Sequence, residues 1–407
     1  MILIKNAAQI VSASGSAPKT GSAMRNIDVI TDSDILIKDD KILKIGRNID
    51  ANGAEIIDAK NMIVMPGFVD AHTHLVFSGT REFEVELKRT GKSYLEIQNS
   101  GGGINYTVKK TRAASKASLK EEARERIKNM VIHGTTTAEA KSGYGLNYKT
   151  ERKILEAVNE LNGELIELVP TFLGAHLVPE EFEAEEYIDY LVSYMPKLAK
   201  LARFIDVFCD KGAFNTAQTK RYLDAGIENG MVPKLHADEL SYIGCSKLAT
   251  EIKAISADHL LKTPENIIRK MSINKTIAVL MPATPYMLFS REYADARKFI
   301  ENNVSVALGT DLNPNCYNEN MQMVISLALT QMKMSIEETI TASTLNAASA
   351  IGMADKIGTL EVGKQADIII LNVPDYRFLG YHFGVNLVND VIKKGKVIVK
   401  DQKLQYL

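Results

Sequence analysis

The chain has 407 residues, 45% of them hydrophobic, and a formal net charge of −1 at pH 7. This length allows one large hydrophobic core or two smaller ones. The balanced charge excludes strong electrostatic binding to nucleic acid or to an anionic membrane. The three cysteines, Cys209, Cys245 and Cys316, are widely spaced, and their odd number argues against a disulfide framework. Without a signal-peptide pattern or an apolar stretch of about 18 residues, we expect a soluble, reduced, cytoplasmic protein.

The pattern at both ends of the chain indicates short β-strands. Apolar runs such as Asp34–Lys38 and Lys41–Ile45 near the start, and Asp367–Leu371 and Lys396–Val399 near the end, are separated by Gly and Asp. Strands this short do not form stable isolated sheets, so we expect the two ends to pack together. The sequence therefore predicts a composite β-sandwich domain formed by residues 1–64 and 359–407.

Residues 65–358 alternate between apolar strand patterns and amphipathic helix patterns. The strand candidates are Gly67–Val76, Thr135–Lys141, Ile166–Leu173, Phe204–Cys209, Pro233–Ala237, Ala254–His259, Thr276–Met281 and Ser305–Thr310. The helix candidates between them include Leu119–Ile132, Thr150–Leu161, Tyr187–Ala202, Thr216–Glu228 and Pro264–Met271, with a helical tail over Asn320–Gly352. Eight β/α units over roughly 250–300 residues match the size of a (β/α)8 barrel. We therefore predict an α/β fold, a TIM-like barrel with the smaller β domain attached.

Unusual polar residues follow most of these predicted strands. Barrel enzymes carry their catalytic groups at the carboxyl ends of the strands. The residues at these ends are His72 and His74 after the first strand, Tyr144 after the second, His176 after the third, His236 and Glu239 after the fifth, His259 after the sixth and Asp311 after the eighth. Of the seven histidines, only His133 and His382 lie elsewhere. The sequence therefore predicts one site at this end of the barrel.

The residue types at these ends suit a metal. In a strand, positions i and i+2 share a face, so His72 and His74 can reach one point. With His236 and Asp311 they make a three-nitrogen, one-oxygen set that fits Zn2+ or a similar first-row ion with a position left for water. A metal lowers the pKa of its water toward about 7, and Asp311 could accept the proton of that water.

Further residues suit contacts with a substrate. Glu239 lies three residues after His236 and could bind a ring nitrogen or shuttle a proton. His259 could stabilise a developing oxyanion or hold the attacking water, and His176 could play a similar part. The guanidinium of Arg81 fits a carboxylate.

Motifs along the whole chain resemble those of one family. The most specific are Phe77–Arg81, Ser100–Ile104, Lys141–Gly145, Phe172–His176, Asp206–Cys209, Met281–Thr284 and Asp311–Pro314, beside the more general Pro66–His74, His236–Glu239 and Gly309–Asp311. Together they resemble the imidazolonepropionases, ring-opening hydrolases of histidine degradation within the amidohydrolase superfamily. The resemblance implies hydrolysis of the cyclic amide of 4-imidazolone-5-propanoate to N-formimidoyl-L-glutamate, by attack of metal-bound hydroxide on the ring carbonyl.

The resemblance also implies a role for each matching residue. The metal, Zn2+ or Fe3+ at one per chain, would be held by His72, His74, His236 and Asp311, and Asp311, His259 and Glu239 would be catalytic. The substrate contacts would be Arg81, Tyr144, His176, Glu239, Asn313, Asn315, Cys316 and Tyr94. Family members typically form dimers, so we expect a homodimer with a small-molecule substrate and no nucleic-acid or membrane partner.

One stretch departs from the family pattern. After Asp311–Pro314 the family usually has Gly and then a hydroxyl residue, where this chain has Asn315 and Cys316. Asn tolerates a left-handed backbone nearly as well as Gly, but Cys is a weaker hydrogen-bond donor than Ser or Thr. We therefore expect this departure to affect how tightly the substrate binds.

Two other functions fit parts of this pattern. A cytosine-deaminase-like enzyme acting on a cyclic amidine or nucleobase would share the barrel and the metal ligands, although a neutral base offers no carboxylate to Arg81. A dinuclear hydrolase would need a bridging lysine in the fourth barrel strand, and Phe204–Cys209 contains none. A non-catalytic scaffold is disfavoured because the full ligand set is present.

Overall fold

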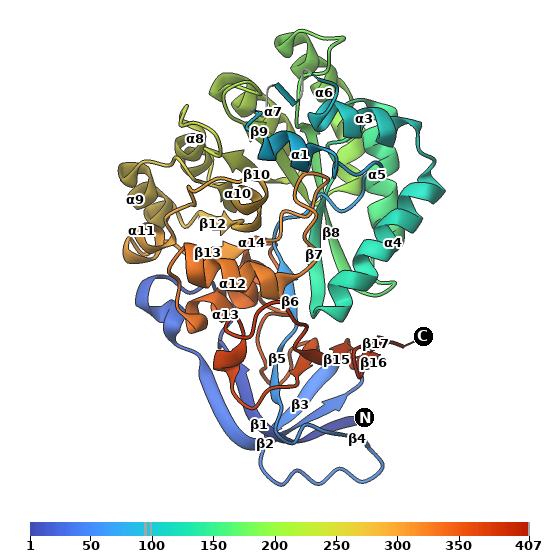
Figure 1. Cartoon of the computed structure of the whole chain (residues 1–407), viewed down its shortest axis with the longest axis vertical. Coiled ribbons are helices and arrows are strands. Elements are labelled where there is room, and N and C mark those ends of the chain that lie inside the picture. The colour runs from blue at the N-terminus through green and yellow to red at the C-terminus, as the bar shows by residue number, and fades with distance from the viewer. Residues whose placement is uncertain (93–95, 98–99, 406–407) are drawn as a thin grey trace.

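The structure is a computed structural model that describes residues 1–92, 96–97 and 100–405. Within these residues the chain forms two sheets, one of eight strands surrounded by helices and one of nine strands built from both ends of the chain (Figure 1). This arrangement confirms the predicted fold class, a parallel α/β barrel with an attached β domain.

The eight-stranded sheet is parallel, and its strands follow one another in chain order. They are β6 (Phe68–Asp70), β7 (Thr135–Lys141), β8 (Glu167–Ala175), β9 (Phe204–Cys209), β10 (Val232–Ala237), β11 (Ser256–His259), β12 (Ile277–Leu280) and β13 (Val306–Leu308). Most of their residues are buried on both faces, as expected of a parallel sheet covered by helices. The bounds of β7 and β9 are those that the sequence predicted.

The first strand differs most from its predicted extent. The sequence indicated Gly67–Val76, but β6 ends at Asp70 and the chain beyond it turns toward the end of β13. There Asp311 donates its backbone N–H to the carbonyl of His72 (3.0 Å), and His74 donates to the carbonyl of Leu312 (2.8 Å). These two bonds join the first and last strands of the barrel just beyond their ends, where the predicted metal ligands lie.

Helices pack around the barrel. They are α1 (Glu84–Arg89), α3 (Gly103–Ala113), α4 (Lys116–Ile132), α5 (Tyr148–Leu161), α6 (Ala184–Leu198), α7 (Thr216–Glu228), α8 (Cys245–Glu251), α9 (Glu265–Asn274), α10 (Ala283–Met287), α11 (Ala296–Glu301), α12 (Met321–Gln331), α13 (Ile336–Ser343) and α14 (Leu345–Ala350). The predicted tail Asn320–Gly352 is three helices rather than one. A capping box at Ser335 and Glu338 starts α13 as a separate helix.

The second sheet brings the two ends of the chain together. Its strands run in the order β17 (Lys403–Leu404), β16 (Lys396–Lys400), β15 (Val388–Lys393), β14 (Ile368–Leu371), β5 (Ile63–Pro66), β1 (Ile2–Ser12), β2 (Asp28–Lys38) and β3 (Lys41–Gly46), with β4 (Glu55–Asp58) paired to β1. The antiparallel pairing of β14 with β5 joins the two chain ends directly. The described residues also form three short helices, η1 (Gly21–Arg25), η2 (Ala199–Leu201) and η3 (Tyr376–Phe378).

Ion pairs connect this sheet to the barrel at the end away from the predicted site. Lys393 of β15 lies 2.9 Å from the carboxylate of Glu167 at the start of β8, and Lys394 lies 3.2 Å from the same carboxylate. Lys393 also pairs with Asp367 at 2.6 Å. The two parts are therefore joined by charged groups as well as by apolar packing.

The cysteines correct the sequence-based expectation. Cys209, at the end of β9, and Cys245, at the start of α8, form a disulfide, with their Cα atoms 5.8 Å apart. Cys316 is a buried free thiol. The odd number of cysteines did not indicate this disulfide. Its two partners are 36 residues apart in sequence and meet only because β9 and β10 lie side by side.

A helix that crosses a membrane has to be long and apolar. Among the described residues, none of the helices combines the length and the apolar character needed to cross a bilayer.

Candidate metal and substrate site

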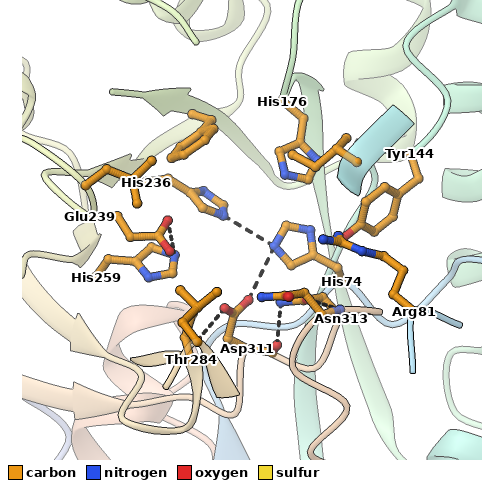
Figure 2. Close-up of a pocket in the computed structure, with 15 residues that line it drawn as sticks. His74, Arg81, Tyr144, His176, His236, Glu239, His259, Thr284, Asp311 and Asn313 are labelled. Carbon is orange, nitrogen blue, oxygen red and sulfur yellow. Dashed lines mark hydrogen bonds and ion pairs between the residues drawn. The ribbon is translucent and has the colours of Figure 1, made fainter. Parts of the chain in front are cut away.

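A pocket opens at the carboxyl ends of the barrel strands. Its lining contains ten of the residues singled out from the sequence: His74, Arg81, Tyr144, His176, His236, Glu239, His259, Asp311, Asn313 and Asn315. The side chains of all of these residues except Asn315 are labelled in Figure 2, where they converge on one space. His72 lies close to them, fully buried. The predicted strand ends therefore meet at one pocket.

The four predicted metal ligands lie close together, and the ligand atoms of His72, His74 and Asp311 are all within 4.8 Å of one another. Nε2 of His74 lies 3.3 Å from Nε2 of His236 and 3.6 Å from Oδ1 of Asp311, and Nε2 of His72 lies 3.5 Å from the same oxygen. Two of these atoms, Nε2 of His72 and Oδ1 of Asp311, are buried without a hydrogen-bond partner among the described residues. Buried polar atoms without partners are rare, and three nitrogens with one carboxylate oxygen suit a first-row metal ion.

The protonation of the histidines agrees with metal binding. Burial lowers the pKa of His72 and of His74 well below the ordinary histidine value, and neighbouring cationic groups lower each pKa further. Neutral imidazole is the form that binds a metal.

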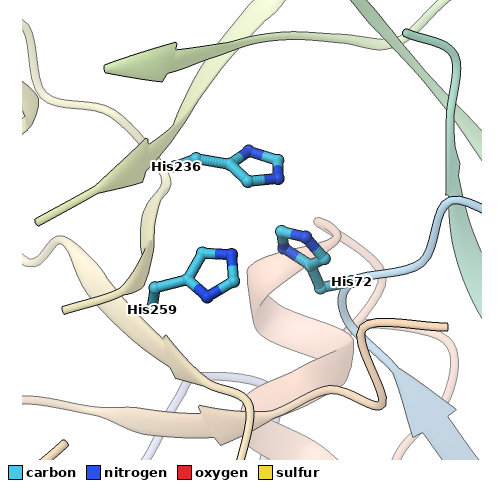
Figure 3. Close-up of side chains that lie close together, drawn as sticks. All are labelled: His72, His236 and His259. Atoms are coloured by element: carbon cyan, nitrogen blue, oxygen red, sulfur yellow. The ribbon is translucent and has the colours of Figure 1, made fainter. Parts of the chain in front are cut away.

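His259 also lies close to this cluster. Figure 3 shows the rings of His72, His236 and His259 facing a common space, and each offers a nitrogen within 4.8 Å of the others. Nε2 of His236 points toward His74, however, whereas Nε2 of His259 lies 3.7 Å from Oε2 of Glu239. The geometry therefore groups His236 with the predicted ligands and His259 with Glu239.

A layer of buried carboxylates orients two of the ligand histidines. Asp258 accepts from Nδ1 of His72 at 2.6 Å, and Asp206 lies 2.9 Å from Nδ1 of His236. A carboxylate on Nδ1 fixes the ring so that Nε2 faces the metal position. Burial alone would raise the pKa of Asp206, but contacts with His236 and Lys141 hold it well below its usual range.

Two buried lysines connect these carboxylates. Nζ of Lys141 lies 2.7 Å from Asp206, 2.8 Å from Glu139 and 3.6 Å from Asp258. Nζ of Lys234 lies 3.1 Å from Glu139. Although burial opposes the charge of Lys141, Asp206 and Glu139 keep its pKa above the ordinary lysine value. The layer is therefore a network of paired charges inside the barrel.

Asp311 is positioned by its backbone and by a threonine. Its φ of 51° lies in the left-handed region, which costs roughly 1–3 kcal/mol and is common where function requires a particular side-chain direction. The hydroxyl of Thr284 donates to Oδ2 of Asp311 at 2.6 Å. Oδ1 is thereby directed toward His72 and His74.

Glu239 lies in the loop that follows β10, and two kinds of contact hold this loop in place. Asp210 accepts from the backbone N–H groups of Leu240 (2.8 Å) and Ser241 (3.0 Å), and the Cys209–Cys245 disulfide joins the end of the loop to β9. Burial, reinforced by Asp311 and Asp210, raises the pKa of Glu239 to about 8. A carboxyl with this pKa can carry a proton near neutral pH.

The opposite side of the pocket contains Arg81, Tyr144 and His176 (Figure 2). The ring of His176 stacks on that of His74, with centroids 5.1 Å apart, and Nδ1 of His176 lies 3.0 Å from the carbonyl of Gly143. Arg81 forms a buried two-point ion pair with Glu84, in which both distances are 2.8 Å. The sequence did not indicate this ion pair.

The loop after β13 presents Asn313 and Asn315 to the pocket, but not Cys316. Asn313 shapes the loop, because its Oδ1 accepts the N–H groups of Asn315 (2.7 Å) and Cys316 (3.0 Å). The sulfur of Cys316 lies 3.7 Å from the carbonyl of Thr310, and its side chain packs with Ala283 and Leu327. Tyr94, the remaining predicted contact, lies outside the described residues.

Sequence reasoning missed several residues of the site. Thr284 was recognised only as part of a motif, and Asp206, Asp258, Lys141 and Lys234 were given no role. Their signal was a charged residue inside an apolar strand, as in Phe204–Cys209, where a buried charge needs a partner. Phe208, Ile104, Leu240 and Leu288, which also line the pocket, carry no such signal.

The fold and the site define a class of protein. The model of the amidohydrolase family matches residues 63–212 and 193–398. The whole chain also superposes on an adenosine deaminase from Xanthomonas campestris with bound zinc, with a TM-score of 0.75 and 19% identity over 100% of this chain and 94% of that one. That likeness concerns the fold alone, whereas the family match covers most of the sequence. The chain belongs to the amidohydrolase family.

Similar full-length relatives narrow the family further. An imidazolonepropionase from Thermoanaerobacter pseudethanolicus is 48% identical over 96% of both chains, and one from Clostridium tetani is 43% identical over 98% of both. Within the amidohydrolase family, the chain is therefore a member of the imidazolonepropionases, as its motifs predicted.

Proposed function

We propose that this protein hydrolyses 4-imidazolone-5-propanoate to N-formimidoyl-L-glutamate, the ring-opening step of histidine degradation. The observation that carries the proposal is that a metal-type ligand group and Arg81 line the same pocket (Figure 2). A ring that bears a short carboxylate side chain offers a group to each of them. The identity to named imidazolonepropionases supports the same substrate.

The metal would be Zn2+ or Fe3+, one per chain, and His72, His74, His236 and Asp311 would hold it. When bound, it supplies a water of lowered pKa as nucleophile and polarises the ring carbonyl. The two atoms without partners, Nε2 of His72 and Oδ1 of Asp311, support this ligand set. The hydrogen bond from Nδ1 of His72 to Asp258 keeps that ring in the required tautomer, and the carboxylate of Asp206 lies 2.9 Å from Nδ1 of His236.

The protons move through two carboxyl groups. Asp311, its other oxygen bonded to Thr284, takes the proton of the attacking water. As the ring C–N bond breaks, Glu239 donates a proton to the departing nitrogen, which suits a carboxyl with a pKa of about 8. His259, 3.7 Å from Glu239, donates a hydrogen bond to the oxygen that gains negative charge.

The remaining pocket residues bind the rest of the substrate. Arg81 pairs with the propanoate carboxylate, and Tyr144 and His176 contact the ring and its side chain. Asn313, Asn315 and the backbone at Cys316 close the pocket on the Asp311 side. Tyr94 is a further substrate contact in this proposal.

The test is an ultraviolet assay of freshly prepared imidazolonepropionate, run beside cytosine. The protein is assayed as purified, after treatment with a chelator, and after Zn2+ or Fe3+ is added back. Loss of imidazolonepropionate that requires metal, with cytosine unchanged, is the expected result. Deamination of cytosine with imidazolonepropionate intact would replace the proposal by the deaminase alternative.

We also propose that the protein is a homodimer, as members of this family typically are. Light scattering of the purified protein tests this directly, because the chain mass is 44.9 kDa. A mass of one chain across the accessible concentrations would reject the dimer.

A further inference from the structure

Arg81 lines the pocket as one member of an ion pair and not as an isolated cation. Its Nε and Nη2 groups donate to the two oxygens of Glu84, and both side chains are almost fully buried. Oε1 of Glu84 also accepts the backbone N–H of Gly103 at 2.7 Å, which fixes the carboxylate in place. A substrate carboxylate that approaches Arg81 therefore also approaches Glu84, and the ion pair offers it no net charge.

A second cation lies beside this ion pair. Lys88 is on α1, four residues after Glu84, and its Nζ donates to Oδ1 of Asn315 across 2.5 Å. Asn315 in turn lines the substrate pocket. Lys88 is partly buried, and burial lowers the pKa of its ammonium group. Glu84 raises this pKa and Arg81 lowers it. Arg81, Glu84 and Lys88 together carry one net positive charge, which is that of Lys88.

We propose that Lys88 is a second recognition residue for the carboxylate of the substrate, and that it acts together with Asn315. Its charge offsets that of Glu84, so that the carboxylate end of the pocket remains attractive to an anion. Its hydrogen bond holds Oδ1 of Asn315, which leaves Nδ2 as the donor of that amide. This inference rests on the proposed function and assigns a specificity role that sequence reasoning had given to Arg81 alone.

A purely structural role would have different consequences. If Lys88 only tied α1 to the loop of Asn315, its loss would affect the binding of charged and neutral ligands alike. If it recognises the carboxylate, its loss weakens only ligands with that charge. Because Lys88 is not among the residues that line the pocket, it acts through its charge and through Asn315, and a charged group in a partly buried site is strong enough to change binding by about tenfold.

The experiment compares Lys88→Met, Lys88→Arg and Asn315→Ala with the metal-loaded wild type. The matched control is Arg89→Met, which removes a positive charge from the next residue of α1, where Arg89 pairs with the exposed Glu86. For each protein, kcat and KM are measured with imidazolonepropionate. Inhibition constants are measured for imidazole-4-propanoate and for its primary amide, which differ only in the charge of the side chain.

We expect Lys88→Met to raise KM and the inhibition constant of the acid by about tenfold, with kcat and the inhibition constant of the amide within about twofold. Lys88→Arg restores most of the loss, Asn315→Ala weakens the acid in the same direction, and Arg89→Met matches the wild type. An unchanged acid constant in Lys88→Met, or equal losses for acid and amide, would overturn the inference. If the wild type leaves imidazolonepropionate intact, the proposed function fails, while the two inhibition constants still test Lys88.

Discussion

Asp258 accepts a hydrogen bond from Nδ1 of His72 across 2.6 Å, and neither side chain is exposed to solvent. The other nitrogen of the same ring, Nε2, lies 3.5 Å from Oδ1 of Asp311. One histidine thus connects the buried charge layer to the metal position. Metal binding should therefore depend on residues that never touch the metal.

Replacing Asp258 by Asn should lower metal affinity by roughly 10- to 100-fold, because the variant loses the charge that orients and polarises His72. Competition with a chromophoric chelator measures the affinity without reference to activity. Asp224→Asn is the control, since it removes a carboxylate that pairs with Lys220 on the surface. Equal affinities in Asp258→Asn and the wild type would refute the orienting role.

Asp311 combines two functions that different substitutions can separate. Asp311→Ala removes a ligand and a proton acceptor and should reduce turnover by more than about 100-fold. Asp311→Asn keeps an oxygen ligand but cannot take the proton, so it should retain more metal than Asp311→Ala at similarly low activity. Metal content and turnover measured on the same samples check this, and near-normal turnover in either variant contradicts the assignment.

Thr284 should affect turnover through Asp311. Thr284→Val keeps the side-chain shape but removes the donor to Oδ2, and we expect kcat to fall by about tenfold with KM little changed. Thr284→Ser should restore most of the rate. Thr219→Val is a matched control, because Thr219 is a buried threonine of α7 whose hydroxyl has no partner among the described residues. A similar loss in both Val variants would point to packing rather than to Asp311.

The positions of the strands and of the pocket could be predicted because both depend on local patterns. Apolar runs such as Phe204–Cys209 produced strand bounds that the structure repeats. Polar residues after the strands identified seven of the residues that line the cavity, which are His74, Tyr144, His176, His236, Glu239, His259 and Asp311. Arg81 was named from its chemistry, and Asn313 and Asn315 from the family resemblance. The early end of β6 was not predictable in this way, because the bonds of His72 and His74 to Asp311 and Leu312 join residues more than 200 positions apart.

Partnerships between distant residues were harder to predict. The contacts of Lys141 with Asp206 and Asp258 depend on the relative register of several strands, which a single sequence does not specify. The pairing of Arg81 with Glu84 requires the turn that begins α1, so the sequence did not indicate it. In both cases the chemical type of the residue was evident and its partner was not.

The junction between the two sheets should make stability depend on pH. Burial alone would raise the pKa of Glu167, but Lys393, Gln365 and Lys394 lower it to about 2. A carboxylate whose pKa is depressed by folding stabilises the folded state fully above its unfolded pKa of 4.5. That contribution, on the order of 2 kcal/mol for this partly buried group, declines as the pH falls below the unfolded value.

Glu167→Gln should therefore unfold at lower urea concentration than the wild type at pH 7. The difference should stay constant down to about pH 4.5 and shrink at lower pH, since the wild type then loses the charge that the variant lacks. Glu125→Gln, which affects an exposed pair with Lys128 on α4, should differ little from the wild type at any pH. A Glu167→Gln difference that grows as the pH falls would show that the ion pairs are not its source.

The disulfide makes a prediction about thiol content. Cys209 and Cys245 have Cα atoms 5.8 Å apart, within the usual range for a disulfide, and the bond joins the end of β9 to the loop that carries Glu239. Protein purified without reductant and then denatured should therefore show one titratable thiol, from Cys316, and three after reduction. Cys316→Ala should show none before reduction and two after it. Three thiols in the unreduced wild type would mean that the loop of Glu239 is held by Asp210 without a covalent link.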